Sequence, residues 1–229
     1  GALSGLFIMF LLFMSVAVIA FIVFVERAQR RLLIQYPKRN VGMKVFQGDS
    51  SHLPLKINTA GVIPPIFASS ILLLPVTAMS FNAGSGPSWM LDVTTLLGRG
   101  QPLYMALYIA AIMFFAFFYT SIVFNPEETA DNLKKNGGFI PGIRPGQNTT
   151  LYIDHVLTRL TLVGALYLSL VCILPEILIA KYAVPFYFGG TSLLIVVNVT
   201  MDTVAQIHSH LIAQQYEGLI KKQKLRGRM

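Results

Sequence analysis

The sequence predicts an all-α polytopic membrane protein with five transmembrane helices. Its 229 residues are 54% hydrophobic and only 12% charged, with a mean hydropathy of +0.63, whereas a soluble domain contains about 25% charged residues. Five apolar stretches alternate with polar segments, and each is long enough to cross the roughly 30 Å hydrocarbon core of a bilayer. The one cysteine, Cys172, lies inside an apolar stretch. It is therefore interpreted as a small buried residue, not as a disulfide partner or a metal ligand.

Residues 1–56 are predicted to form the first membrane helix and a long basic loop. The uncharged run 3–25 is the helix, and the loop begins at Glu26. Gln-Gly-Asp-Ser-Ser at 47–51 has the composition of a turn, so its flanks are expected to pair as a short hairpin. The chain opens with Gly1 directly before an apolar run, without the basic leader region of a signal peptide. This start predicts a cut from a longer chain, or processing.

Residues 57–124 are predicted to contain the second helix, an external loop and the third helix. The second helix, at 57–79, is unusual because Pro64 and Pro65 fall inside it and Pro75 lies near its end. An interior proline removes a backbone hydrogen bond and bends a helix, which membranes tolerate when neighbouring groups satisfy the freed carbonyl. We therefore expect this helix to be bent.

A polar stretch at 125–159 follows the third helix and is predicted to bind a partner, because loops on a rigid scaffold often carry function. Asn125, followed by Pro126 and two acidic residues, has the pattern of a helix start, and Gly137-Gly138 is expected to end that short helix. Arg144 lies between two Pro-Gly pairs, which favour tight turns. The stretch should form a firm projection with Arg144 near its tip.

Residues 160–205 contain the predicted fourth and fifth helices, and residues 206–229 form a basic tail. Of the 18 Lys and Arg residues, only Arg99 and Lys181 fall on the side of the membrane opposite the basic loops and the tail. The positive-inside rule therefore assigns the first loop, the partner-binding stretch and the tail to one cytoplasmic face. Asn198 is an unusual polar residue within the fifth helix.

Groups that could carry catalysis or bind a metal are sparse in this sequence. It offers no paired carboxylates and no serine–histidine pair at membrane depth. His208 and His210, two positions apart, do not share a helix face. We therefore predict no cofactor and no metal site, and we do not expect an enzyme.

Several strings resemble the SecY family of bacterial protein-translocation channels, and in particular its proteobacterial members. They occur in the family's order and cover essentially the whole chain. They are VERAQRR at 25–31, HLPLKIN at 52–58, GVIP at 61–64, FNPEETADNLKK at 124–135, IPGIRPG at 140–146 and PFYFGGTSLLI at 185–195.

This resemblance implies the C-terminal half of a ten-helix channel whose two halves face each other like a clamshell. Such a channel lets unfolded polypeptides cross the bacterial inner membrane, or releases them sideways into the lipid bilayer. The implied partners are the N-terminal half of the same channel, SecE, SecG, the SecA ATPase, the ribosome and the translocating polypeptide. The basic loops and the C-terminus would be cytoplasmic.

The resemblance also implies roles for residues inside the membrane. Ile66 and Ile195 match the family's ring of aliphatic side chains, a constriction that can fit varied peptides and block ions by dewetting. The second helix matches the family's lateral gate, with a small group of residues near the gate: Pro64, Pro65, Ser69 and Ser70.

Outside the membrane, the resemblance implies contacts with the ribosome or the SecA motor. Arg144 matches the family's basic loop tip, and Tyr216 in the tail matches a motor-coupling position. The first basic loop supplies a further set of contact residues: Arg30, Arg31, Lys38, Arg39 and Lys44. Such clusters suit ribosomal RNA phosphates.

Two other function classes remain as alternatives. A small-molecule secondary transporter also uses bent helices and Gly-rich openings, but it would need a compact polar site at mid-membrane, for which Asn198, Ser69 and Ser70 are the candidates. A membrane anchor for a soluble partner would use only the basic loops.

Overall fold

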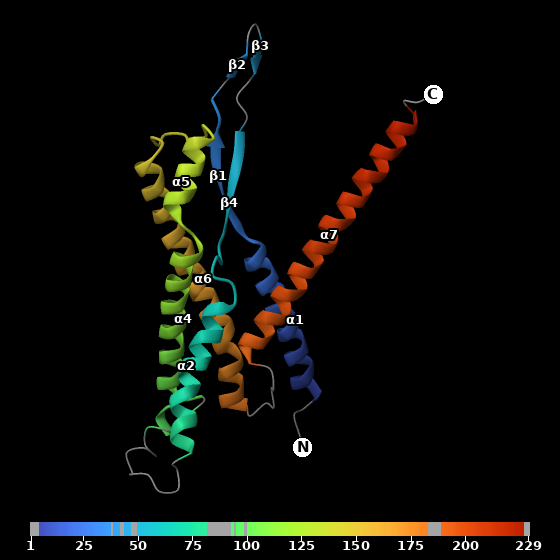
Figure 1. Ribbon diagram of the computed structural model, residues 1–229. Helices are drawn as coiled ribbons and strands as arrows, with labels where there is room; N and C mark the ends of the chain where they lie inside the picture. Colours follow the sequence, from blue (N-terminus) through green and yellow to red (C-terminus); the bar gives the residue numbers. More distant parts are fainter. Residues whose placement is uncertain are drawn as a thin grey trace. The chain divides into compact units, whose positions relative to one another are not determined.

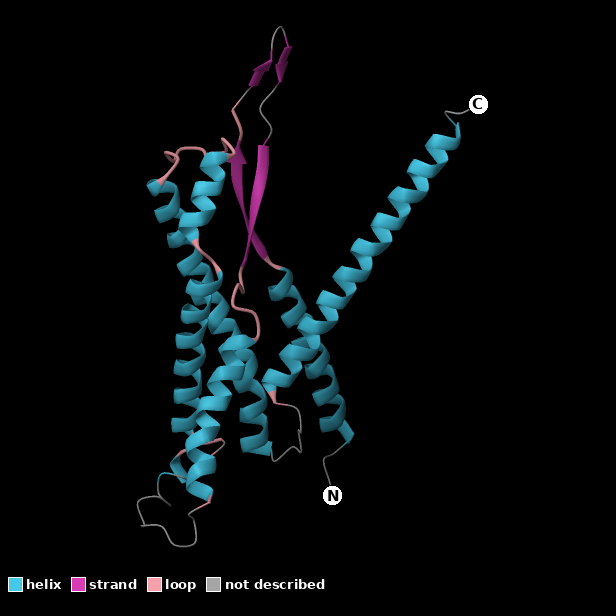
Figure 2. Cartoon of the chain, in the orientation of Figure 1, coloured by secondary structure: helices cyan, strands magenta, loops and turns pink. Residues whose placement is uncertain are grey.

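Helices predominate in the computed structural model (Figure 2), and the described strands follow the first helix in the sequence and precede the second. By its internal contacts the chain divides into two compact units: residues 1–23 with 192–229 form one, and residues 24–191 form the other. The structure describes residues 5–37, 39–41, 44–46, 50–81, 93, 95–98, 100–182 and 189–226.

The described helices are α1 (Gly5–Arg27), α2 (Ile63–Ser80), α4 (Pro102–Val123), α5 (Pro126–Lys135), α6 (Gln147–Tyr182) and α7 (Gly190–Arg226) (Figure 1). Four described helical stretches are long and apolar enough to cross a membrane: Gly5–Arg27, Pro102–Lys135, Gln147–Lys181 and Gly190–Gln214. The apolar part of α2, Ile63–Met79, is shorter than these. The mostly helical membrane fold is therefore confirmed, with the second predicted span shorter than expected.

Within residues 24–191, α4 packs against α2 and α6, and α5 packs against α6. The buried side chains of α4 recur at every fourth position and form one stripe along the helix: Tyr104, Tyr108, Ile112, Ala116 and Thr120. Positions four apart lie on the same face of a helix, so a single stripe is the face that meets its neighbours. This stripe is the face of α4 that packs against α2 and α6.

Two antiparallel strand pairs occupy the predicted basic loop. β1 (Gln29–Gln35) pairs with β4 (Ser50–Lys56), and β2 (Arg39–Val41) pairs with β3 (Lys44–Phe46) (Figure 1). The predicted hairpin is therefore present. Of the predicted turn at 47–51, Ser50 and Ser51 instead belong to β4, and residues 47–49 lie outside the described residues. The alternation of buried and exposed side chains along the strands favours this register, because it places Leu32 and Ile34 of β1 and Leu55 of β4 on the buried face.

The start of α2 corrects the prediction of interior prolines at 64 and 65. α2 begins at Ile63 with its prolines in the first turn, where backbone amides have no partner within the helix, so proline costs nothing there. Pro64 and Pro65 therefore start the helix and do not bend it. Only Pro75 lies inside α2.

The helices α6 and α7 are both longer than predicted. α6 begins at Gln147, well before the expected start at 160, because Ile153, Val156 and Leu157 supply a buried helical stripe within a stretch that is polar on average. It also continues through Pro175 to Tyr182. α7 extends the fifth span as a helix to Arg226, through most of the predicted tail.

Two glycines allow backbones to approach α6 closely. A Cβ at residue 164 would lie 2.8 Å from the carbonyl oxygen of Ile57, in the segment that leads into α2. A Cβ at residue 190 would lie 2.7 Å from the Cα of Cys172 and 2.9 Å from the carbonyl oxygen of Val171. That carbonyl is the one that Pro175 deprives of its helical donor. Small residues are what membrane helices use for such close contacts.

Gly164→Val should destabilise the chain, because the new side chain would meet backbone atoms that cannot move aside. Overpacking of this kind costs about 1–3 kcal/mol, which should appear as a lower melting temperature in circular dichroism of the detergent-solubilised chain. Leu162→Val is the matched control, since residue 162 lies on the same helix and is 44% exposed. Equal melting temperatures for the two variants would contradict the close-packing argument.

Candidate functional site

The polar connection between α4 and α6 is built on the short helix α5. The side chain of Asn125 accepts hydrogen bonds from the amides of Glu127 (3.0 Å) and Glu128 (3.4 Å), which caps the helix as predicted. At the other end Gly137 has φ +72°, its amide donates to Lys134, and the amide of Gly138 donates to Leu133. This pair of bonds is a Schellman motif, which ends α5 where the sequence predicted.

Tight turns surround Arg144 as expected. The amide of Ile143 donates to the carbonyl of Ile140 at 3.1 Å, and Gly142 and Gly146 both have positive φ, at 83° and 107°. The hydroxyl of Thr149, which is buried, donates to the carbonyl of Arg144 at 3.0 Å. The backbone of Arg144 is therefore fixed from the first turn of α6, while its side chain is exposed.

The strand β1 and the α5–α6 connection are joined directly. Gln35 and Phe139 exchange two backbone hydrogen bonds of 2.9 Å, as in a sheet. The neighbouring Gly138 makes the approach possible, because a Cβ there would lie 3.0 Å from Ile34 and 3.1 Å from Tyr36. Two segments about a hundred residues apart in sequence thus form one structure.

A hydrophobic core lies beneath this junction. Its buried members come from β1, β4, the α5–α6 connection and the first turns of α6: Leu32, Leu55, Ile140, Ile153 and Val156. Phe124 and Leu133 pack against it with several other partly buried residues. Burial of apolar side chains of this size stabilises by about 1.5–3 kcal/mol each, so the core gives the two polar segments a common rigid base.

The predicted contact residues fall on different parts of this structure. Arg30 and Arg31 on β1 and Arg144 on the connection are exposed, and we call these three the basic surface. As neighbours in a strand, Arg30 and Arg31 point to opposite faces of β1. Arg39 lies in β2 and Lys44 in β3. Tyr216 lies in α7, and Lys38 is outside the described residues.

The predicted gate residues all lie on α2. Pro64 and Pro65 are buried in its first turn, while Ile66 is 38% exposed. The hydroxyls of Ser69 and Ser70 both donate to the carbonyl of Ile66, at 2.9 and 2.8 Å. Their protons are therefore used within the helix, and outwardly these serines present acceptors only.

Ile195, the second predicted ring residue, lies on α7 and is 36% exposed. Ile66 and Ile195 belong to different compact units of the chain. Each is thus an exposed aliphatic side chain on its own apolar helix. A residue that lines an apolar pore must be exposed in this way.

A polar cluster that sequence reasoning did not single out fixes the approach to α2. The amide of Asn58 donates to the carboxylate of Glu26 at 2.6 Å and to the carbonyl of Gly61 at 3.1 Å. Tyr167 of α6 also interacts with Glu26. The sequence did contain a signal for this pair. Glu26 ends one apolar run and Asn58 starts the next, and polar groups at the edge of apolar runs need partners.

Comparison with known proteins identifies relatives over nearly the whole chain. The family model of SecY matches residues 2–204. Protein translocase subunit SecY of Rickettsia conorii is 57% identical over 227 residues, which is 99% of this chain and 52% of that protein. The SecY subunits of Vibrio cholerae and Escherichia coli K12 are 56% identical over 231 residues and 55% identical over 228 residues. In both cases the match spans 99% of this chain and 52% of the relative. This chain therefore spans about half the length of the curated relatives it matches, corresponding to their C-terminal half.

Two solved structures share the fold. One is described as the structure of a protein conducting channel, and the other concerns the plug domain of the SecY protein and the closed state of the translocation channel. Each has a TM-score of 0.56 at 15% identity and covers 85% of this chain and 48% of the solved chain. With its fold, the family model and its relatives in agreement, this chain belongs to the SecY family.

Proposed function

We propose that this chain forms the C-terminal half of a protein-conducting channel, which moves unfolded polypeptides across the bacterial inner membrane or releases them laterally into it. The observation that carries the proposal is the identity to translocase subunits over nearly the entire chain. In this role the chain is a conduit and not an enzyme. The alternative of a small-molecule transporter finds no support among these relatives and is not proposed.

The basic surface is proposed to receive the SecA motor or the ribosome. Arg30, Arg31 and Arg144 are exposed on two segments that share one core and two backbone hydrogen bonds. A rigid display lowers the entropy lost on binding, and exposed arginines suit both acidic protein surfaces and RNA phosphates. Lys38, Arg39, Lys44 and Tyr216 are proposed to extend this contact.

The membrane part is proposed to line the channel. Ile66 and Ile195 would contribute apolar side chains to the constriction, and α2, with Pro64, Pro65, Ser69 and Ser70, would form this half of the lateral gate. An aliphatic constriction excludes ions by dewetting and still adapts to passing side chains. The N-terminal half of the channel, SecE and SecG are the proposed neighbours in the bilayer, with the basic loops and the C-terminus in the cytoplasm.

Reversing the charge at the loop tip should block export. With the N-terminal half supplied in the same membrane, Arg144→Glu is expected to lower SecA-driven import of a preprotein into inverted vesicles at least tenfold, because like charges would face each other at the contact. Lys181→Glu, an equal reversal at the other end of α6, is the control and should have little effect. Unchanged import with Arg144→Glu at normal protein levels would count against the proposed contact.

A polar residue in the constriction should open a path for ions. Ile66→Asn is expected to raise the resting conductance of the reconstituted complete channel severalfold, since an amide favours wetting of the pore. Ile71→Asn, at a 49% exposed position elsewhere around α2, is the matched control. If both variants stay as tight as the parent channel, residue 66 is not in the ring.

Separating the two polar segments should weaken partner binding without touching an arginine. Gly138→Val would place a branched side chain against Ile34 and Tyr36 and is expected to cost about 1–3 kcal/mol at the junction. Affinity for SecA, measured with membranes containing the channel, should fall several-fold. Leu33→Val, on the outward face of β1, is the control. Full SecA affinity in Gly138→Val would mean that the junction does not position the basic surface.

A further inference from the structure

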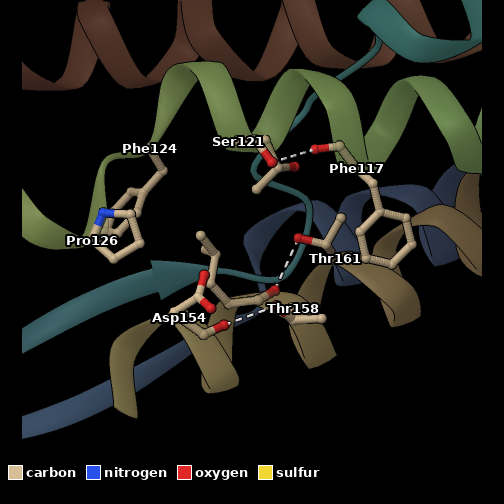
Figure 3. Close-up of a pocket in the computed structure, with 9 residues that line it drawn as sticks. Phe117, Ser121, Phe124, Pro126, Asp154, Thr158 and Thr161 are labelled. Atoms are coloured by element: carbon tan, nitrogen blue, oxygen red, sulfur yellow. Dashed lines mark hydrogen bonds between the residues drawn. The ribbon is translucent and has the colours of Figure 1, made fainter. Parts of the chain in front are cut away.

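A pocket of about 130 Å³ lies between the ends of α4 and α6 next to the first residue of α5 (Figure 3). Drug-sized ligands occupy sites of roughly 300–1,000 Å³, so this pocket suits a small chemical group. Its walls combine the rings of Phe117 and Phe124 with the side chains of Asp154 and Thr158. The lining contains one carboxylate and no basic residue.

The hydroxyl groups of the pocket offer acceptors to a ligand. Ser121 donates its proton to the carbonyl of Phe117 at 3.0 Å. Thr158 and Thr161 donate to the residues four positions earlier, both at 2.9 Å. A hydroxyl has one proton and two acceptor lone pairs. These three oxygens can therefore only accept further hydrogen bonds, and Figure 3 shows them around the same space.

Two further groups at the pocket lack partners. The carboxylate of Asp154, an exposed residue, faces Phe124 and Pro126 across the pocket (Figure 3), and it forms no hydrogen bond or ion pair with the described residues. Thr120, only 4% exposed, lines the pocket, and its hydroxyl oxygen makes no hydrogen bond within the described structure. A buried polar atom left unsatisfied costs about 1–3 kcal/mol, so the wall of the pocket includes a polar oxygen that no described residue satisfies.

We propose that this pocket binds a primary ammonium group, and that its source is the headgroup of phosphatidylethanolamine. An ammonium carries three N–H donors and one positive charge, which complements a carboxylate surrounded by acceptor oxygens. The rings of Phe117 and Phe124 add the aromatic surface that favours cations. Charge and donor number thus point to the same chemical group.

The surroundings favour a lipid as the carrier of that ammonium. The pocket lies where the apolar helix α4 ends at Val123 and the charged α5 begins, which is the usual depth of a lipid headgroup. Exposed apolar side chains continue from it toward the middle of both helices, with Phe114 and Phe118 on α4 and Leu162 and Leu166 on α6. Acyl chains can lie against these residues while the headgroup occupies the pocket. The inference does not depend on the proposed channel function.

The test uses the full chain in nanodiscs of phosphatidylcholine and phosphatidylglycerol that contain a small fraction of phosphatidylethanolamine. Retained phosphatidylethanolamine is counted by native mass spectrometry after release from the disc. Asp154→Asn should lower its retention about tenfold, since a charge-assisted hydrogen bond is lost. Asp131→Asn, at an exposed carboxylate on α5 outside the pocket, should leave retention unchanged. Equal retention in both variants would overturn the proposal.

A second arm changes the lipid and keeps the protein intact. Stepwise methylation of the ethanolamine nitrogen keeps its charge and removes its donors, so retention should fall with each methyl group. Retention that is independent of methylation would overturn the donor argument. Free ethanolamine, added in excess, should displace little lipid. If it displaces the lipid fully, or if the pocket crosslinks to a lysine of another protein and to no lipid, the assignment to a lipid headgroup is wrong.

Discussion

Two backbone hydrogen bonds between Gln35 and Phe139 connect the polar segments on which the rest of this structure depends. They are possible because Gly138 has no side chain, and they lie over a core to which Leu32 and Ile140 both contribute. Without this junction the β1–β4 ribbon and the α5–α6 connection would be separate loops. Each would then lose its own conformational entropy on meeting a partner. The junction joins them into one structure with a shared core.

In the apolar helices, the governing constraint is that every polar group needs a partner. Hydroxyls along α2, α4, α6 and α7 donate to carbonyls three or four residues earlier, as Ser69 and Thr161 do. Asn58 and Glu26 satisfy each other where two segments meet. Gly164 and Gly190 let backbones approach until their polar atoms are covered. Within the described structure, the hydroxyl of Thr120, which lines the pocket between α4 and α6, and one carboxylate oxygen of Glu176 are exceptions to this pattern.

Sequence patterns predicted the parts of this fold that depend on local chemistry. The cap at Asn125, the end of α5 at Gly137 and the turns around Arg144 all followed from neighbouring residues, and all are present. Tertiary features were missed. The early start of α6 depends on Ile153 and Val156 packing against a strand far away in sequence, which average polarity concealed. The role of Pro64 was misjudged because composition shows that a proline is in an apolar run, but not which turn of the helix it occupies.

The bonds around Ile66 also bear on how a constriction could work. A ring that excludes ions by dewetting must present few groups that attract water, and a backbone carbonyl facing a pore would be such a group. In α2 the carbonyl of Ile66 accepts from the hydroxyls of both Ser69 and Ser70, so its acceptor capacity is used inside the helix. The two serines implied as gate residues thereby shield the backbone of the proposed ring residue. Each serine oxygen keeps its own acceptor lone pairs, so on this reasoning the proposed seal depends on the side chain of Ile66, which stays exposed and apolar.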